Sequence, residues 1–148
     1  MELQTLSPEE CALLLAAGSV GRVGISERAL PVVLPVNYAV LDGDIVIRTG
    51  AGTKLDAALT GAVVAFEIDA MDPIYHQGWS VLVQGRAHEV VDLDELERVR
   101  ALPLEPWAAG IRDRFVRIVT RRMTGRRIAL PASSNAGNGN GVNKGESL

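Results

Sequence analysis

The stretch Ile45–Leu59, IVIRTGAGTKLDAAL, constrains the fold more than any other part of the chain. The β-branched run Ile45–Ile47 predicts a strand, and Gly50–Gly52 ends it because glycine turns sharply at little steric cost. Thr53 carries a hydroxyl that suits a helix N-cap, which predicts a short helix over Lys54–Leu59. The chain must therefore pass from a strand to a helix through a nearly bare backbone loop.

This loop predicts a binding site for an anion, with phosphate as the expected ligand. Arg48 and Thr49 end the strand, and Lys54 stands on the first helical turn. The loop N–H groups of Gly52 and Thr53, the positive end of the helix dipole and the two cations together favour a negative group. The same local pattern is equally compatible with an ordinary Gly-rich turn that exposes a lysine to solvent.

A second strand is expected over Leu30–Val40, LPVVLPVNYAV, and it contains two prolines. Each proline removes a backbone donor, so this strand is expected to be bulged or at a sheet edge, with its backbone free to face a ligand or simply facing solvent. Asp42-Gly43 is a strong hairpin signal. We therefore expect Pro35-Val36-Asn37 to lie beside the strand that leads into the anion loop.

The rest of the chain reads as further strands and two more short helices. Ser7, Pro8 and Glu10 form a capping box that opens the first helix, and another helix is expected from Asp92 to about Leu102. The remaining expected strands are Val20–Ile25, Ala62–Ile68, Gly78–Val91 and Phe115–Ile128. Six strands joined mostly by hairpins, without βαβ alternation, predict a mainly β protein that closes as a small antiparallel barrel.

The composition of the chain narrows the functional classes to which the protein can belong. A chain of 148 residues with a net charge of −3 favours neither bulk nucleic acid nor a membrane surface as a partner. The acidic start MELQTLSPEE lacks the pattern of a signal peptide, so a cytoplasmic protein is expected. One cysteine and two histidines make a structural metal site unexpected. Residues 1–130 are expected to form one domain, and 131–148 a disordered polar tail.

Three blocks, PVVLPVNYAVLDGDIVIRTGAGTKLDAAL, GWSVLVQGRAHEV and FVRIVTRRMTGRRI, resemble the pyridoxamine 5′-phosphate oxidase-like family of flavoproteins, and in particular its short actinobacterial members. The resemblance implies a six-stranded antiparallel split β-barrel and a homodimer that binds FMN, or in some branches a deazaflavin, between its subunits. It also implies an oxidoreductase that transfers hydride to or from a small organic molecule. Residue by residue, it assigns the flavin ring to Pro35, Val36 and Asn37, and the ribityl phosphate to Arg48, Thr49, Thr53 and Lys54.

In the same resemblance, Trp79 and Ser80 match positions that approach the flavin from the partner subunit. Arg126 falls near a position where pyridoxamine oxidases carry an aromatic residue, which places pyridoxamine phosphate in doubt as the substrate.

The residues themselves indicate no catalytic set of side chains. His76 and His88 are expected at the surface, and flavin chemistry needs no protein nucleophile. A non-catalytic protein that stores, senses or scavenges a flavin, a deazaflavin or haem therefore remains an alternative. A run of arginines near the C-terminus is expected to pair with acidic residues on a solvated strand face, or to supply one or two contacts to an anion; it comprises Arg112, Arg114, Arg117, Arg121, Arg122, Arg126 and Arg127.

Overall fold

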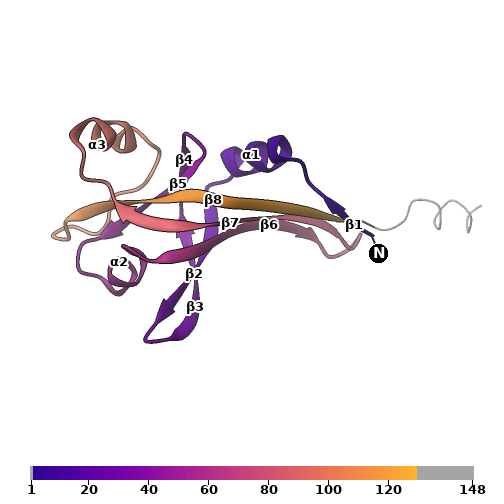
Figure 1. Cartoon of the computed structure of the whole chain (residues 1–148), viewed down its shortest axis with the longest axis horizontal. Coiled ribbons are helices and arrows are strands. Elements are labelled where there is room, and N and C mark those ends of the chain that lie inside the picture. Colours follow the sequence, from indigo (N-terminus) through magenta and orange to yellow (C-terminus); the bar gives the residue numbers. More distant parts are fainter. Residues whose placement is uncertain (1, 130–148) are drawn as a thin grey trace, which may run out of the picture.

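Within residues 2–129, which this computed structural model describes, the chain forms one antiparallel sheet of eight strands with three short helices (Figure 1). The expected tail after Pro131 lies outside the described residues. In chain order the elements are β1 (Glu2–Thr5), α1 (Pro8–Ala17), β2 (Val20–Glu27), β3 (Leu30–Asn37), β4 (Ala39–Leu41), β5 (Asp44–Gly50), α2 (Lys54–Leu59), β6 (Val63–Asp72), β7 (Gln77–Glu89), α3 (Leu93–Arg100) and β8 (Asp113–Ala129).

The order of the strands makes the sheet curl into a split barrel. The strands follow the order β3-β2-β6-β7-β8-β5-β4, with β1 added beside β8. β3 and β4 stand at opposite ends of this order, yet only Tyr38 separates them in the chain. The sheet must therefore bend round until its two end strands meet. The long strands β7 and β8 run through the molecule from the end with α2 and α3 to the end with β1 (Figure 1).

The main core lies inside the curl and is built from alternating apolar residues of several strands. Val23, Ile47, Phe66 and Val81 are all essentially fully buried in it. A Cβ atom on Gly21 would lie 2.3 Å from the Phe66 ring, so the glycine makes room for this aromatic core residue. None of the described helices is long and apolar enough to cross a membrane.

Several local predictions are confirmed. The Ser7 hydroxyl accepts the Glu10 N–H at 3.2 Å, and Thr53 caps α2. The turn at Asp42-Gly43 joins β4 to β5 as an antiparallel pair. Each of these features depends on residues that are close in the sequence, and for that reason the pattern is sufficient to predict them.

The structure differs from the expected six strands by adding β1 and by dividing Leu30–Val40 into β3 and β4. The division falls at Tyr38, whose N–H donates to the carbonyl of Ser19 and whose buried hydroxyl donates to that of Leu15 at 2.6 Å. β3 is an edge strand, as its prolines predict, but it pairs with β2. Pro35-Val36-Asn37 does lie next to β5, as expected, but the strand that pairs with β5 across the Asp42-Gly43 turn is β4.

Candidate functional site

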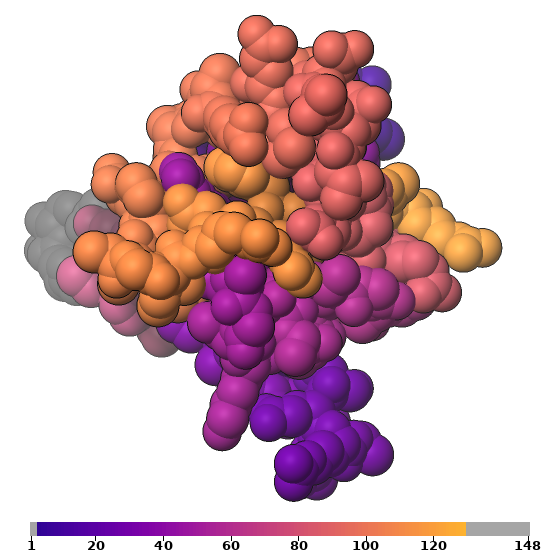
Figure 2. All heavy atoms as spheres, turned by 90° about the vertical axis from the view of Figure 1, so that its left-hand side faces the viewer, coloured from indigo at the N-terminus to yellow at the C-terminus, as the bar shows by residue number. Residues whose placement is uncertain are grey.

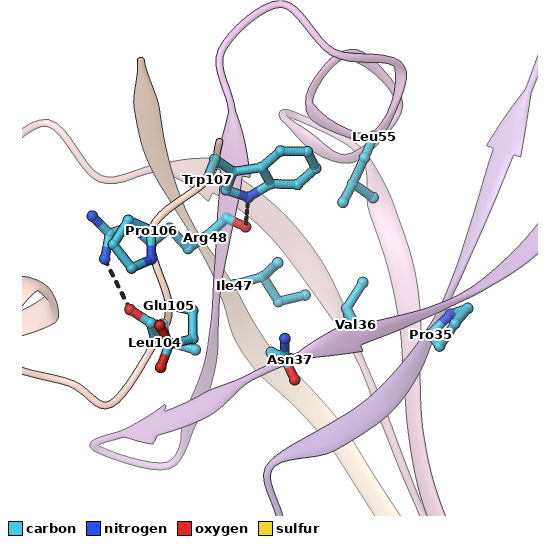
Figure 3. Close-up of a pocket in the computed structure, with 10 residues that line it drawn as sticks. All are labelled: Pro35, Val36, Asn37, Ile47, Arg48, Leu55, Leu104, Glu105, Pro106 and Trp107. Atoms are coloured by element: carbon cyan, nitrogen blue, oxygen red, sulfur yellow. Dashed lines mark hydrogen bonds between the residues drawn. The ribbon is translucent and has the colours of Figure 1, made fainter. Parts of the chain in front are cut away.

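A cavity of about 380 Å³ lies between β3, β5, α2 and the loop that joins α3 to β8 (Figure 3). Figure 3 shows Trp107 and Leu55 on one side of the cavity and Val36 and Asn37 on the other. We call this space the ring cavity. Its lining residues are Pro35, Val36, Asn37, Ile47, Arg48, Leu55, Leu104, Glu105, Pro106 and Trp107.

The walls of the ring cavity are mainly apolar, and polar groups stand at its margin. Val36, Ile47 and Leu55 come from three separate elements, whereas Asn37 and Arg48 supply amide and guanidinium groups. Because β3 is an edge strand, one side of its backbone has no strand partner and can offer hydrogen bonds to a ligand. The structure thus brings together four of the residues that the sequence predicted for the flavin site, namely Pro35, Val36, Asn37 and Arg48.

Sequence reasoning missed the wall that the loop with Trp107 supplies. The indole Nε1 of Trp107 donates to the carbonyl of Arg48 at 2.7 Å, and its backbone N–H donates to Asp113 at 3.0 Å. A Cβ atom on Gly50 would lie 3.2 Å from this indole and 2.7 Å from Ile111. Gly50 therefore serves the close packing of the loop on β5. A tryptophan beside Pro106, in a loop whose residues are mostly apolar, was the available signal.

Arg48 is fixed by contacts within the chain. Its guanidinium donates to the carbonyl of Leu104 at 2.8 Å, forms an ion pair with Asp113 and lies 5.0 Å from the centre of the Phe115 ring. The hydrogen bond from Arg48 lowers the pKa of the Asp113 carboxyl below its usual value. Among the described residues, no acceptor contacts the buried Nε of Arg48. Arg48 thus both shapes the ring cavity and anchors the loop that covers it.

The expected anion loop contains an anion of its own, the carboxylate of Asp56. This carboxylate accepts the N–H of Gly52 at 3.0 Å and the hydroxyl of Thr49 at 3.2 Å, and the side chain is almost fully buried. Two of the predicted phosphate donors therefore already have a partner. Thr53 caps α2, and its hydroxyl donates to the carbonyl of Gly50 at 2.7 Å. Lys54 is exposed beside Leu55, a lining residue of the ring cavity.

The remaining predicted residues lie at the far end of the long strands. Trp79 pairs with Arg127 and Ser80 with Arg126, whereas Arg48 pairs with Phe115 near the start of β8. Arg127 lies twelve positions after Phe115 on β8, which at 3.3 Å per residue is about 40 Å along the strand. One copy of the chain does not bring these two groups together.

The expected pairing with acidic residues is confirmed for three members of the arginine run, but Arg117 is only 14% exposed and does not lie on a solvated face. Arg117 pairs with Asp44 and Glu95 at 2.8 and 2.7 Å, and Arg127 pairs with Glu10 at 3.3 Å. Arg114 pairs with Asp56 and Glu89 at 3.2 and 3.3 Å. Within residues 2–129, the other members have no ion pair; they are Arg112, Arg121, Arg122 and Arg126.

Neither histidine belongs to the ring cavity. His76 is exposed in the turn between β6 and β7, and its φ of 51° is in the left-handed region. His88 lies near the end of β7, opposite Arg117 on β8. The cysteine at position 11 is buried in the main core. The described lining residues therefore include no side chain of the kinds that most often serve as haem ligands.

Comparisons with known proteins match one family over most of the chain. Residues 7–127 match the family model described as pyridoxamine 5′-phosphate oxidase. Uncharacterized protein Rv0080 of Mycobacterium tuberculosis is 39% identical over 132 residues, which are 86% of each chain. A solved FAD binding protein from Mycobacterium smegmatis is 34% identical with a TM-score of 0.78, covering 86% of this chain and all of that one. A putative pyridoxamine 5′-phosphate oxidase from Corynebacterium glutamicum is 32% identical with a TM-score of 0.71, covering 88% and 98%.

Proposed function

We propose that this chain, which belongs to the pyridoxamine 5′-phosphate oxidase family, binds a flavin with the flavin's ring in the ring cavity. The observation that carries the proposal is the coincidence of an apolar slot, an edge strand and a polar margin at Pro35–Asn37. A flavin ring has flat apolar faces and a pyrimidine edge rich in donors and acceptors. Val36, Ile47 and Trp107 suit the faces, while Asn37 and the free edge of β3 suit the pyrimidine.

FMN is the flavin that we assign, with Lys54 as the main phosphate contact. Lys54 is exposed on the first turn of α2, and the next residue, Leu55, lines the ring cavity. A phosphate at this rim would meet the ammonium group of Lys54 and the positive end of a short helix. Because Asp56 already holds the N–H of Gly52, we assign the phosphate to the outer side of the loop, at Thr53 and Lys54.

A homodimer would complete this site. Trp79, Ser80 and Arg126 stand about 40 Å along β8 from the ring cavity, as estimated from the rise per residue of a strand. These residues can approach the flavin only if a second copy supplies them. A two-fold arrangement would use the same surfaces twice and create two equivalent sites.

We further propose an oxidoreductase that acts on a small organic molecule. A bound flavin supplies hydride transfer, so the chain itself needs only to bind and orient the flavin and the substrate and to exclude water from them. The loop with Trp107 covers one wall of the ring cavity, and the ion pair between Arg48 and Asp113 holds that loop in place. A deazaflavin in place of FMN, and a non-catalytic flavin carrier in place of an enzyme, are the alternatives that the cofactor spectrum and activity assays distinguish.

The variant Lys54→Ala tests the assignment of the phosphate. Loss of one charge-assisted contact, worth roughly 1.5–3 kcal/mol, should weaken FMN binding by on the order of 10- to 100-fold. Riboflavin has no phosphate, so its affinity should stay the same. Both affinities are measured by quenching of flavin fluorescence. Arg28→Ala is the matched control, because Arg28 is an exposed cation in the turn between β2 and β3.

Each outcome of this titration has a distinct meaning. An equal loss of FMN and riboflavin affinity would show that Lys54 acts on the fold of the loop. Unchanged FMN affinity would place the phosphate elsewhere. A wild-type protein that binds neither flavin would refute the proposed function as a whole.

A further inference from the structure

A second and larger cavity, of about 670 Å³, lies beside the ring cavity at the end of the molecule that carries α3. Figure 2 looks onto this end, with α3 above and the loop and the start of β8 below it. We call this space the basic cleft. Arg48 lines both cavities, so the two adjoin at this residue. The basic cleft is lined by Arg48, Glu89, Val90, Val91, Leu96, Arg100, Arg112, Asp113, Arg114 and Phe115.

The charged lining of the basic cleft consists of four arginines and two carboxylates. Arg48 pairs with Asp113, and Arg114 pairs with Glu89 at 3.3 Å. Arg100 and Arg112 are exposed and have no ion pair within residues 2–129. Two positive charges of the lining are therefore left without a counter-charge.

The free arginines belong to parts of the chain that are held in place. Arg100 ends α3, a helix capped by Asp92 and packed through the fully buried Val99. The carbonyl of Arg112 accepts the N–H of Ala51 at 2.7 Å, which ties the start of β8 to the loop after β5. Because the backbone is anchored at both positions, only the two arginine side chains have to be ordered when a ligand binds.

The lining of the cleft also has an apolar part. Val91 and Leu96 add an apolar side to the cleft, where the organic part of a ligand can pack.

We infer that the basic cleft binds an organic phosphate with two negative charges, held between Arg100 and Arg112. The shared chemistry has two possible sources. One is the diphosphate of a flavin dinucleotide whose ring lies in the adjoining ring cavity, in which case both phosphates lie in the cleft and not at Lys54, and the other is a separate phosphorylated molecule. The inference goes beyond the proposed flavin site, because phosphate binding in the cleft does not require a bound flavin.

The first test uses pyrophosphate as the probe, titrated calorimetrically into the full-length protein with and without FMN. The variants Arg100→Ala and Arg112→Ala should each weaken binding about tenfold, and the double variant about 100-fold, since each removes one charge-assisted contact. The control Arg28→Ala removes the same charge outside the cleft and should leave the affinity unchanged. Thermal melting checks that the variants fold, which we expect because both arginines are exposed.

The second test identifies the source of the phosphate. If FAD binds more tightly than FMN and the double variant abolishes this difference, the ligand is a dinucleotide that spans both cavities. If FAD and FMN bind equally while AMP displaces pyrophosphate, the ligand is a separate phosphorylated molecule. Absence of pyrophosphate binding, or equal binding by wild type and the double variant, overturns the inference. Because FMN and riboflavin affinities are measured separately, failure of the flavin proposal leaves this result interpretable.

Discussion

The buried carboxylate of Asp56 should be the main support of the loop between β5 and α2. It accepts hydrogen bonds from Gly52, Thr49 and Thr60 at 3.0, 3.2 and 3.3 Å. It also pairs with Arg114 at 3.2 Å, and its own side chain is only 4% exposed. The variant Asp56→Ala would deprive three donors and a guanidinium of this carboxylate.

The expected cost can be estimated from these contacts. Removing one member of a buried ion pair costs about 3–5 kcal/mol, and the lower value applies here because Arg114 is 26% exposed and partly hydrated. A domain of this size loses roughly 3–4 °C of melting temperature per kcal/mol, so Asp56→Ala should melt about 10 °C lower. Asp56→Asn keeps one oxygen acceptor and should lose about 1–2 kcal/mol.

Urea unfolding and calorimetry measure both variants. Glu97→Ala is the control, because Glu97 is an exposed carboxylate on α3, and it should stay within about 0.5 kcal/mol of wild type. A melting temperature for Asp56→Ala within about 2 °C of wild type would refute the reasoning, because the loop would then have to be held by contacts other than those of Asp56.

Three further predictions concern the ring cavity and the assembly. Gly50→Ala should lower FMN affinity, because a Cβ at this position would lie 3.2 Å from the indole of Trp107. In the control Gly24→Ala the nearest neighbour of the new Cβ lies at 3.6 Å, so this variant should bind FMN normally. Flavin titration measures the affinity of both variants. The lowered pKa of Asp113 means that its ion pair stabilises the fold above the ordinary value of 3.8 and that this contribution disappears as the pH falls further. In a Trp79→Phe background, the fluorescence of Trp107 should therefore change only below pH 3.8, and Asp113→Asn should show the changed signal at neutral pH. Light scattering should find a dimer, and a monomer that binds FMN with full affinity would contradict the shared site.

The local features of the fold could be predicted because their causes are local. The capping box at Ser7 and Glu10 and the hairpin at Asp42-Gly43 involve residues no more than a few positions apart. The edge position of β3 follows from its prolines, since a strand with missing donors cannot pair regularly on both sides. Tyr38 shows where such reasoning ends. Its two hydrogen bonds reach Ser19 and Leu15, and these distant partners break the expected strand in two.

The candidate site shows the same division between local and distant causes. The apolar slot beside Pro35-Val36-Asn37 could be expected, but the partner of Arg48 could not, because Asp113 is far away in the sequence. On the sequence pattern alone, an arginine at the end of a strand is as compatible with binding a phosphate as with pairing with a distant carboxylate. For Asp56 a signal was present, since an acidic residue three positions after the capping Thr53 commonly turns back to the start of its helix.

Two glycines of the loop between β5 and α2 show most clearly how a local cause differs from a distant one. Gly52 has a φ of +81°, which its neighbours impose locally and which the Gly-Ala-Gly pattern predicts. Gly50 has an ordinary φ and is small for a different reason, because Trp107 and Ile111 of a distant loop press on it. A glycine required by backbone conformation can be recognised from its neighbours in sequence. A glycine required by packing can be recognised only once the residue that packs on it is known, so the covered wall of the ring cavity had to come from the structure.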